Sequence, residues 1–147
     1  MLDTIKSLIR NNDLCVLATN GEQGPHTSLM AYACSSDCTE MYLVTSKKTL
    51  KYRNISKNPV VSLMVDTREK NARQDVRALT ISGRAIEIHD LAKLSTIRNE
   101  MRTRHGHLAG LIDQPDVAWI CVYIEAFQLL NGVHTSHHVR LSSDRER

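Results

Sequence analysis

Residues 45–55 read TSKKTLKYRNI, the segment of this chain whose pattern is most specific for a fold. It continues an apolar run, MYLVTS, that is typical of a strand. From Thr49 onward the pattern predicts a helix, which ends at Asn58-Pro59 because the residue before a proline disfavours helical backbone angles. The segment therefore predicts a strand that passes directly into a helix, with four cations at the junction: Lys47, Lys48, Lys51 and Arg53.

The start of this predicted helix carries groups that suit a phosphate. The first N–H groups of a helix have no internal partner, and they lie at the positive end of the helix dipole. Thr45, Ser46 and Thr49 add hydroxyl donors, and Lys51 adds a full positive charge. A hydroxyl cap followed by a solvated basic face gives the same pattern. These residues alone therefore leave both a phosphate site and a solvated helix open.

The rest of the chain predicts a mainly β fold. Short apolar runs separated by turn residues predict six strands, at residues 14–20, 26–34, 41–46, 60–66, 76–88 and 117–130. Gly83 marks a bulge or bend in the fifth strand. Two further helices are expected at residues 2–12 and 91–106, capped by Asp3 and Asp90. The polar residues 67–75 predict a mobile loop.

The order of these elements favours an antiparallel sheet or barrel with flanking helices. Strands follow one another through short loops, and no strand–helix–strand alternation of the parallel kind is present. The sequence also lacks the glycine-rich phosphate loops of dinucleotide-binding domains and P-loop NTPases. Neither of those classes is therefore expected.

Length and composition describe an ordinary globular domain. The chain has 147 residues, 41% hydrophobic and 24% charged, which fits one domain with one core. A net charge of +3 is too small to indicate nucleic-acid binding. The longest apolar run, residues 117–124, is too short to cross a bilayer, and the charged N-terminus does not resemble a signal peptide. We expect a cytoplasmic protein that binds neither nucleic acid nor membrane.

The four cysteines are expected to be reduced thiols. Cys15 and Cys121 lie in strand-like runs, where cysteine behaves as a small hydrophobe. Cys34 and Cys38 have a spacing compatible with zinc, but no second pair of ligands with a matching pattern follows. Reduced thiols are therefore favoured over a metal site.

The order of motifs resembles the FMN-binding split β-barrel family, which includes the relatives of pyridoxamine 5'-phosphate oxidase. The resemblance rests on LATNGEQGPHTSLMAY, TSKKTLKYRNI, NPVVSLMVD and LTISGRA, and it covers residues 1–131. It implies a six-stranded antiparallel split barrel over these residues, followed by a polar tail at residues 132–147. It also implies a homodimer that holds two FMN molecules between its subunits and acts on a small molecule.

The resemblance assigns two groups of cofactor-binding residues. Strand two lines the flavin ring with its backbone, at Ser28, Leu29, Met30 and Ala31. The end of strand three and the next helix hold the phosphate, at Thr45, Ser46, Thr49 and Lys51.

The chain departs from the larger oxidases of the family at several of their cofactor positions. Those enzymes have arginine where Ser28 and Leu50 stand, lysine where Ala33 stands and glutamine near Ala78. Lys48 or Arg77 would then supply the missing positive charge. The arginine- and tryptophan-rich C-terminal segment that binds pyridoxine phosphate is also missing, so we do not expect pyridoxamine phosphate oxidation.

Three other functions stay open within the same fold. A deazaflavin (F420) reductase shares the phosphate site, and a flavin carrier or sensor would bind FMN without turnover. Some family members bind haem through C-terminal histidines, which makes His134, His137 and His138 candidates, although a polar tail is favoured for this segment.

The remaining candidate residues have structural interpretations that we favour. His105 and His107 lie at a helix end, where a cationic imidazole suits the dipole, and His26 begins a strand near the expected flavin edge. Trp119 is expected in the core or a dimer interface. No residue stands out as a general acid or base, and Ser28 lacks the neighbours of a hydrolase triad.

Overall fold

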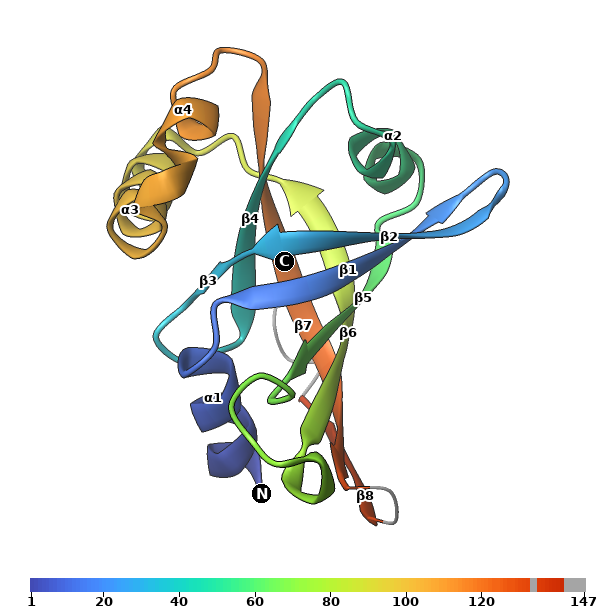
Figure 1. Cartoon of the computed structure of the whole chain (residues 1–147). Helices are drawn as coiled ribbons and strands as arrows, with labels where there is room; N and C mark the ends of the chain where they lie inside the picture. Colours follow the sequence, from blue (N-terminus) through green and yellow to red (C-terminus); the bar gives the residue numbers. More distant parts are fainter. Residues whose placement is uncertain (133–134, 142–147) are drawn as a thin grey trace.

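The computed structural model describes residues 1–132 and 135–141, which form one antiparallel sheet with helices around it (Figure 1). The strands are β1 (Leu14–Gly21), β2 (Gly24–Ala31), β3 (Ala33–Cys34), β4 (Glu40–Ser46), β5 (Val60–Asp66), β6 (Arg77–Glu87), β7 (Val117–Asn131) and β8 (Thr135–Arg140). The helices are α1 (Leu2–Arg10), α2 (Leu50–Lys57), α3 (Leu91–Arg104) and α4 (Ala109–Ile112), with short 3-10 turns η1 (Arg73–Asp75) and η2 (Gly106–Leu108). No helix in the described part of the chain is long and apolar enough to span a membrane.

The strands are ordered β2-β1-β5-β6-β7-β4-β3, and β8 pairs with β7 beside this path. The sheet curls around a core formed by inward-facing apolar residues such as Leu17, Leu63 and Ile81. A second core lies between α3, α4 and the other face of β4 and β7, and it contains Val44 and Trp119. The predicted class, a mainly β antiparallel split barrel with flanking helices, is therefore confirmed.

The bend at Gly83 is also confirmed. The pairing of β6 with β7 changes register between Ser82 and Gly83. A Cβ at Gly83 would lie 2.4 Å from the Tyr123 carbonyl oxygen, so only glycine lets the two backbones approach this closely. The bend helps β6 curve around the core and carry Glu87 to α2.

One of the two predicted helix caps is confirmed, and the other is wrong. Asp90 caps α3, where its Oδ1 accepts from the backbone N–H groups of Ala92 and Lys93. The prediction for Asp3 was wrong, since α1 already begins at Leu2 and places Asp3 in its first turn. There its charge still complements the helix dipole.

The sheet has two strands more than the six predicted. The second predicted strand breaks at Tyr32, whose side chain turns into the core and donates from Oη to the Ile9 carbonyl at 2.6 Å. β3 therefore forms separately, against β4.

The other added strand, β8, lies in the segment interpreted as a polar tail. The segment is polar, yet its backbone pairs with β7 from Ala126 to Asn131. β7 has 15 residues and offers this edge, and the partly buried Val139 of β8 packs against the core. His134 and the final SSDRER lie outside the described residues.

The predicted loop at residues 67–75 contains the short turn η1 and local hydrogen bonds. Thr67 accepts from the backbone N–H groups of Lys70 and Asn71. The loop therefore has defined local structure as well as its polar surface.

Candidate functional site

The hydroxyls predicted to bind a phosphate meet where β4 passes into α2. Thr49 is the N-cap residue of α2, and its Oγ1 accepts from the Tyr52 N–H at 3.3 Å. The buried Thr45 places its Oγ1 3.1 Å from the Thr49 Oγ1. Ser46 joins them in the same turn, where its Oγ accepts from the Lys48 N–H. The three hydroxyl residues therefore form one compact group at the start of the helix.

The cations around this group differ in how far they are neutralised. Lys47 lies 3.8 Å from Glu87, and the exposed Lys48 lies 3.7 Å from Asp116. Lys51 forms neither an ion pair nor a side-chain hydrogen bond with any residue in the described ranges. Lys51 is therefore the cation whose charge is available to an anion at the helix start.

Glu87 also connects the helix to the barrel. Its Oε1 accepts from the Tyr52 hydroxyl at 2.7 Å, and this hydrogen bond is the main reason that the pKa of Tyr52 is raised. Glu87 lies at the end of β6, 35 residues away in sequence, so the sequence pattern gave no sign of this contact. The contact holds α2 in place beside the end of β4.

The structure does not support Arg77 as a substitute cation within one subunit. Arg77 begins β6 and Glu87 ends it, and 11 residues of extended strand span roughly 35 Å. Only the Glu87 end of the strand contacts α2. Arg77 therefore lies far from the hydroxyl group of the same chain.

The strand-two residues lie on an edge of the sheet. β2 ends the strand order and pairs with β1, so the other side of its backbone has no described strand partner. Leu29 is 69% exposed, Ser28 and Ala31 are half-buried, and Met30 packs into the core. Because the backbone groups of a strand point alternately to its two sides, every second residue of this stretch offers N–H and C=O groups to the free edge, and the Met30 side chain is buried in the core.

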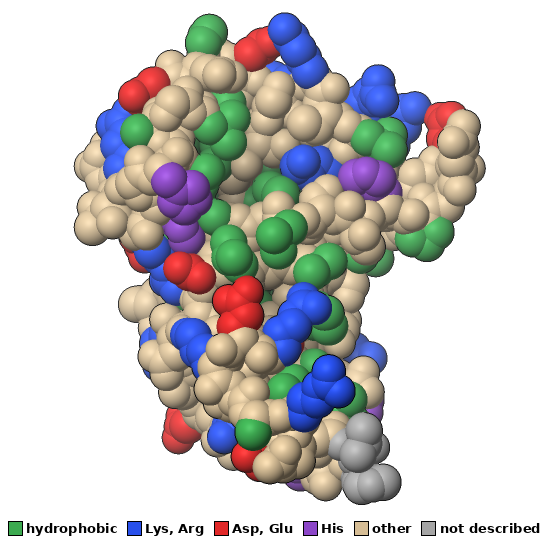
Figure 2. Space-filling model, viewed as in Figure 1, with side chains coloured by type: hydrophobic (Ala, Val, Ile, Leu, Met, Phe, Trp, Pro, Cys, Tyr) green, Lys and Arg blue, Asp and Glu red, His purple; other side chains and the backbone are tan. Residues whose placement is uncertain are grey.

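The two predicted groups lie on neighbouring elements. α2 packs against β1 and β2, and the buried Asn54 donates from Nδ2 to the Thr19 Oγ1 at 3.0 Å. Figure 2 shows a hollow between the α2 side and the α3–α4 side, with hydrophobic side chains inside it. A flat ring against β2 and a phosphate at α2 could therefore belong to one ligand.

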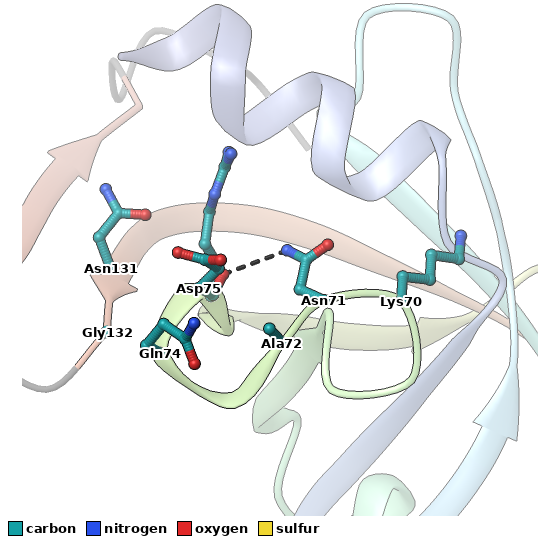
Figure 3. A pocket seen from close by; sticks show the side chains of 8 residues that line it. Lys70, Asn71, Ala72, Gln74, Asp75, Asn131 and Gly132 are labelled. Atoms are coloured by element: carbon teal, nitrogen blue, oxygen red, sulfur yellow. Dashed lines mark hydrogen bonds between the residues drawn. The ribbon is translucent and has the colours of Figure 1, made fainter.

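A separate polar pocket of 600 Å³ lies at the opposite end of the barrel (Figure 3). It is formed by the β5–β6 connection together with Asn131 and Gly132. Asn71 donates from Nδ2 to the Asp75 carbonyl across its wall, and Lys70 donates to the Asn11 carbonyl. This pocket contains none of the residues predicted to bind the flavin ring or the phosphate, but Arg77, the candidate substitute cation, lines it.

The histidines in the described part of the chain do not cluster as metal ligands. His105 lies at the end of α3, as predicted, and it is buried with its Nε2 2.8 Å from the Tyr32 carbonyl oxygen. His137 and His138 are consecutive in β8 and therefore point to opposite faces of the sheet. Among the described residues no cluster of three or more histidine, cysteine or acidic side chains could hold a metal.

The cysteines are free thiols, as expected. Burial raises the pKa of Cys15 and of Cys121 to about 12, and that of Cys34 to about 11. The Sγ atoms of Cys34 and Cys38 lie 3.9 Å apart. Trp119 is buried in the second core, with Arg98 stacked over its ring, which agrees with the predicted core position.

Comparison with solved structures gives the same fold. A heme binding protein from Mycobacterium smegmatis has a TM-score of 0.84 at 16% identity, over 95% of this chain and 57% of that protein. General Stress Protein 26 from Bacillus anthracis str. Sterne gives 0.75 at 20% identity, over 95% and 98% of the two chains. HutZ, the heme storage protein from Vibrio cholerae, gives 0.72 at 24% identity, over 88% and 93%.

A comparison with curated proteins finds no match. The family model of pyridoxamine 5'-phosphate oxidase, in contrast, matches residues 1–131, which include every strand of the barrel except β8 and both predicted groups of site residues. Together with the split-barrel fold, this match shows that the chain belongs to the pyridoxamine 5'-phosphate oxidase family.

Proposed function

We propose that this chain is a cytoplasmic FMN-binding oxidoreductase that works as a homodimer on a small molecule, with residues 1–131 as its flavin-binding domain. The observation that carries the proposal is the group of hydroxyls and one unpaired lysine at the start of α2.

The start of α2 fits the phosphate of FMN. The N–H groups of Leu50 and Lys51 belong to the first turn and have no intrahelical partner. The hydroxyls of Thr45 and Thr49 are already close together, so a phosphate oxygen can accept from this group without moving the backbone. Lys51 adds the unpaired charge, and no carboxylate in the described structure is within ion-pair distance of it.

The edge of β2 suits the flavin ring. When bound, the flavin would accept and release the electrons. Backbone N–H groups between Ser28 and Ala31 would donate to the ring edge and stabilise the negative charge of its reduced form. The exposed Leu29 would cover the ring or the subunit boundary, which keeps water away. We assign no side chain the role of general acid or base.

The outer face of the barrel supports a homodimer. The strand register places Leu29, Val16 and Met64 side by side across β2, β1 and β5. Leu29 is 69% exposed and Met64 36% exposed, although both are apolar. A second copy of the chain would bury this row, and it would place a second subunit beside the flavin site at β2.

Haem binding is the second candidate function, because two of the similar structures are described as haem-binding or haem-storage proteins. His137 and His138 lie on β8, and His138 is exposed. Only one of them can face a given haem, and a single histidine is enough to supply the axial ligand of the iron. A deazaflavin reductase and a flavin carrier without turnover share the proposed phosphate site and are distinguished by the ligand bound and by turnover.

Titration of the apoprotein with FMN and with riboflavin tests the proposal. The two molecules share the ring and differ by the phosphate, so we expect FMN to bind at least about 100-fold more tightly, as two or more charge-assisted contacts would give. Equal affinities would contradict a phosphate site at α2. Addition of haem and of deazaflavin to the same apoprotein separates the candidate ligands, since each has a distinct absorption spectrum.

A further inference from the structure

A second pocket lies on the side of α2 that faces the β1–β2 turn. Its volume is 890 Å³, within the range of sites for small organic ligands. The β1–β2 turn projects beside α2 (Figure 1). Residues of this turn and of α2 line the pocket. The residues that line the pocket include Gly21, Glu22, Gly24, His26, Arg53, Asn54 and Lys57.

A nearly buried amide forms part of the wall. Asn54 is only 5% exposed, and its Nδ2 is held by the hydrogen bond to Thr19. Its Oδ1 accepts no hydrogen bond from any described residue. Solvent reaches this oxygen atom. The remaining polar atom of this fixed amide is therefore open to the pocket.

His26 adds a second directed group. Its Nδ1 is cut off from solvent and has no partner within the described structure. The other ring nitrogen, Nε2, is not buried from solvent, so a ligand in the pocket can reach it. Because an N–H buried without a partner is costly, the proton of the neutral ring is favoured on Nε2, which then donates into the pocket.

Arg53 supplies an available positive charge. Lys57 is neutralised by Glu22, 2.9 Å away across the edge of the pocket. Arg53 is exposed and forms no ion pair with any residue that the structure describes. The pocket therefore combines an unpaired guanidinium, a ring N–H and a fixed amide, a set that matches an anion with further hydrogen-bonding groups.

We propose that this pocket binds a small organic anion, whose carboxylate or phosphate group pairs with Arg53 while Asn54 and His26 orient the rest. The site is separate from the proposed flavin phosphate site. Of the residues near the helix start, Leu50 lines the pocket, whereas Thr45, Ser46, Thr49 and Lys51 do not. The proposal therefore goes beyond FMN binding and does not depend on it.

The test is an NMR titration of the full chain with two probes in separate experiments, citrate and inorganic pyrophosphate. We expect at least one probe to shift the backbone signals of Gly21 and Gly24 and the side-chain amide of Asn54. Arg53→Ala should weaken that binding by about tenfold or more, and Arg53→Lys should restore part of it. Arg53 is exposed, so neither variant is expected to disturb folding.

A control variant decides whether the effect is local. Arg73→Ala removes another exposed arginine, at the far end of the barrel, and should leave the affinity unchanged. The proposal is overturned if neither probe shifts the pocket signals, if Arg53→Ala binds as tightly as wild type, or if the shifts are confined to residues 45–51.

Discussion

Replacing Lys51 with alanine removes the lysine at the start of α2 that has no counter-ion in the described structure. A charge-assisted hydrogen bond contributes roughly 1.5–3 kcal/mol, and partial exposure of Lys51 to solvent places it at the lower end. The expected loss is about 1.5 kcal/mol, which is about a tenfold weaker affinity for FMN.

Quenching of flavin fluorescence during titration of the apoprotein measures this affinity. Riboflavin lacks the phosphate, so its affinity should be the same for wild type and Lys51→Ala. Lys6→Ala is the matched control, because Lys6 is also a half-buried helical lysine without an ion pair among the described residues. Raising the salt concentration should reduce the difference between wild type and Lys51→Ala. Unchanged FMN affinity, or an equal loss for riboflavin, would show that Lys51 does not contact the phosphate.

Three further predictions address the cap, the dimer and the thiols. Thr49→Ala should cost about 1 kcal/mol of stability in urea unfolding, because the Tyr52 N–H loses its acceptor; an unchanged midpoint would contradict this. Leu29→Glu should shift the protein towards monomer in sedimentation equilibrium, whereas Leu91→Glu, at a residue 82% exposed on α3, should not. The raised pKa of Cys34, about 11, predicts slow alkylation at pH 8 that accelerates as the pH rises towards 11, because only the thiolate reacts. Fast alkylation of native Cys34 at pH 8 would refute it.

The parts of the fold that depend on short-range patterns could be predicted from sequence. Asn58-Pro59 ends α2 near the predicted residue, Asp90 caps α3, and Gly83 bends β6. Each of these effects acts within a few residues of its cause. Local chemistry of this kind also pointed to Thr45 and Thr49 as hydroxyl groups of one site, and the structure places their Oγ1 atoms 3.1 Å apart.

The parts that were missed depend on contacts distant in sequence. Tyr32 breaks the second predicted strand because its hydroxyl finds the Ile9 carbonyl, 23 residues away. β8 forms because β7 offers it an edge, and its own polar residues carry no strand signal. Asn54 is a polar residue in a basic helix, yet it is buried and bonded to Thr19, which lies 35 residues away in sequence.

The most direct test of the account is the absorption spectrum of the freshly purified protein, followed by heat release of any chromophore and measurement of its mass. The account predicts the visible bands of oxidised flavin and a released molecule with the mass of FMN. A Soret band would instead support haem binding. A colourless protein that also fails to take up added FMN would contradict the central claim that the hydroxyls and Lys51 at the start of α2 hold a flavin phosphate.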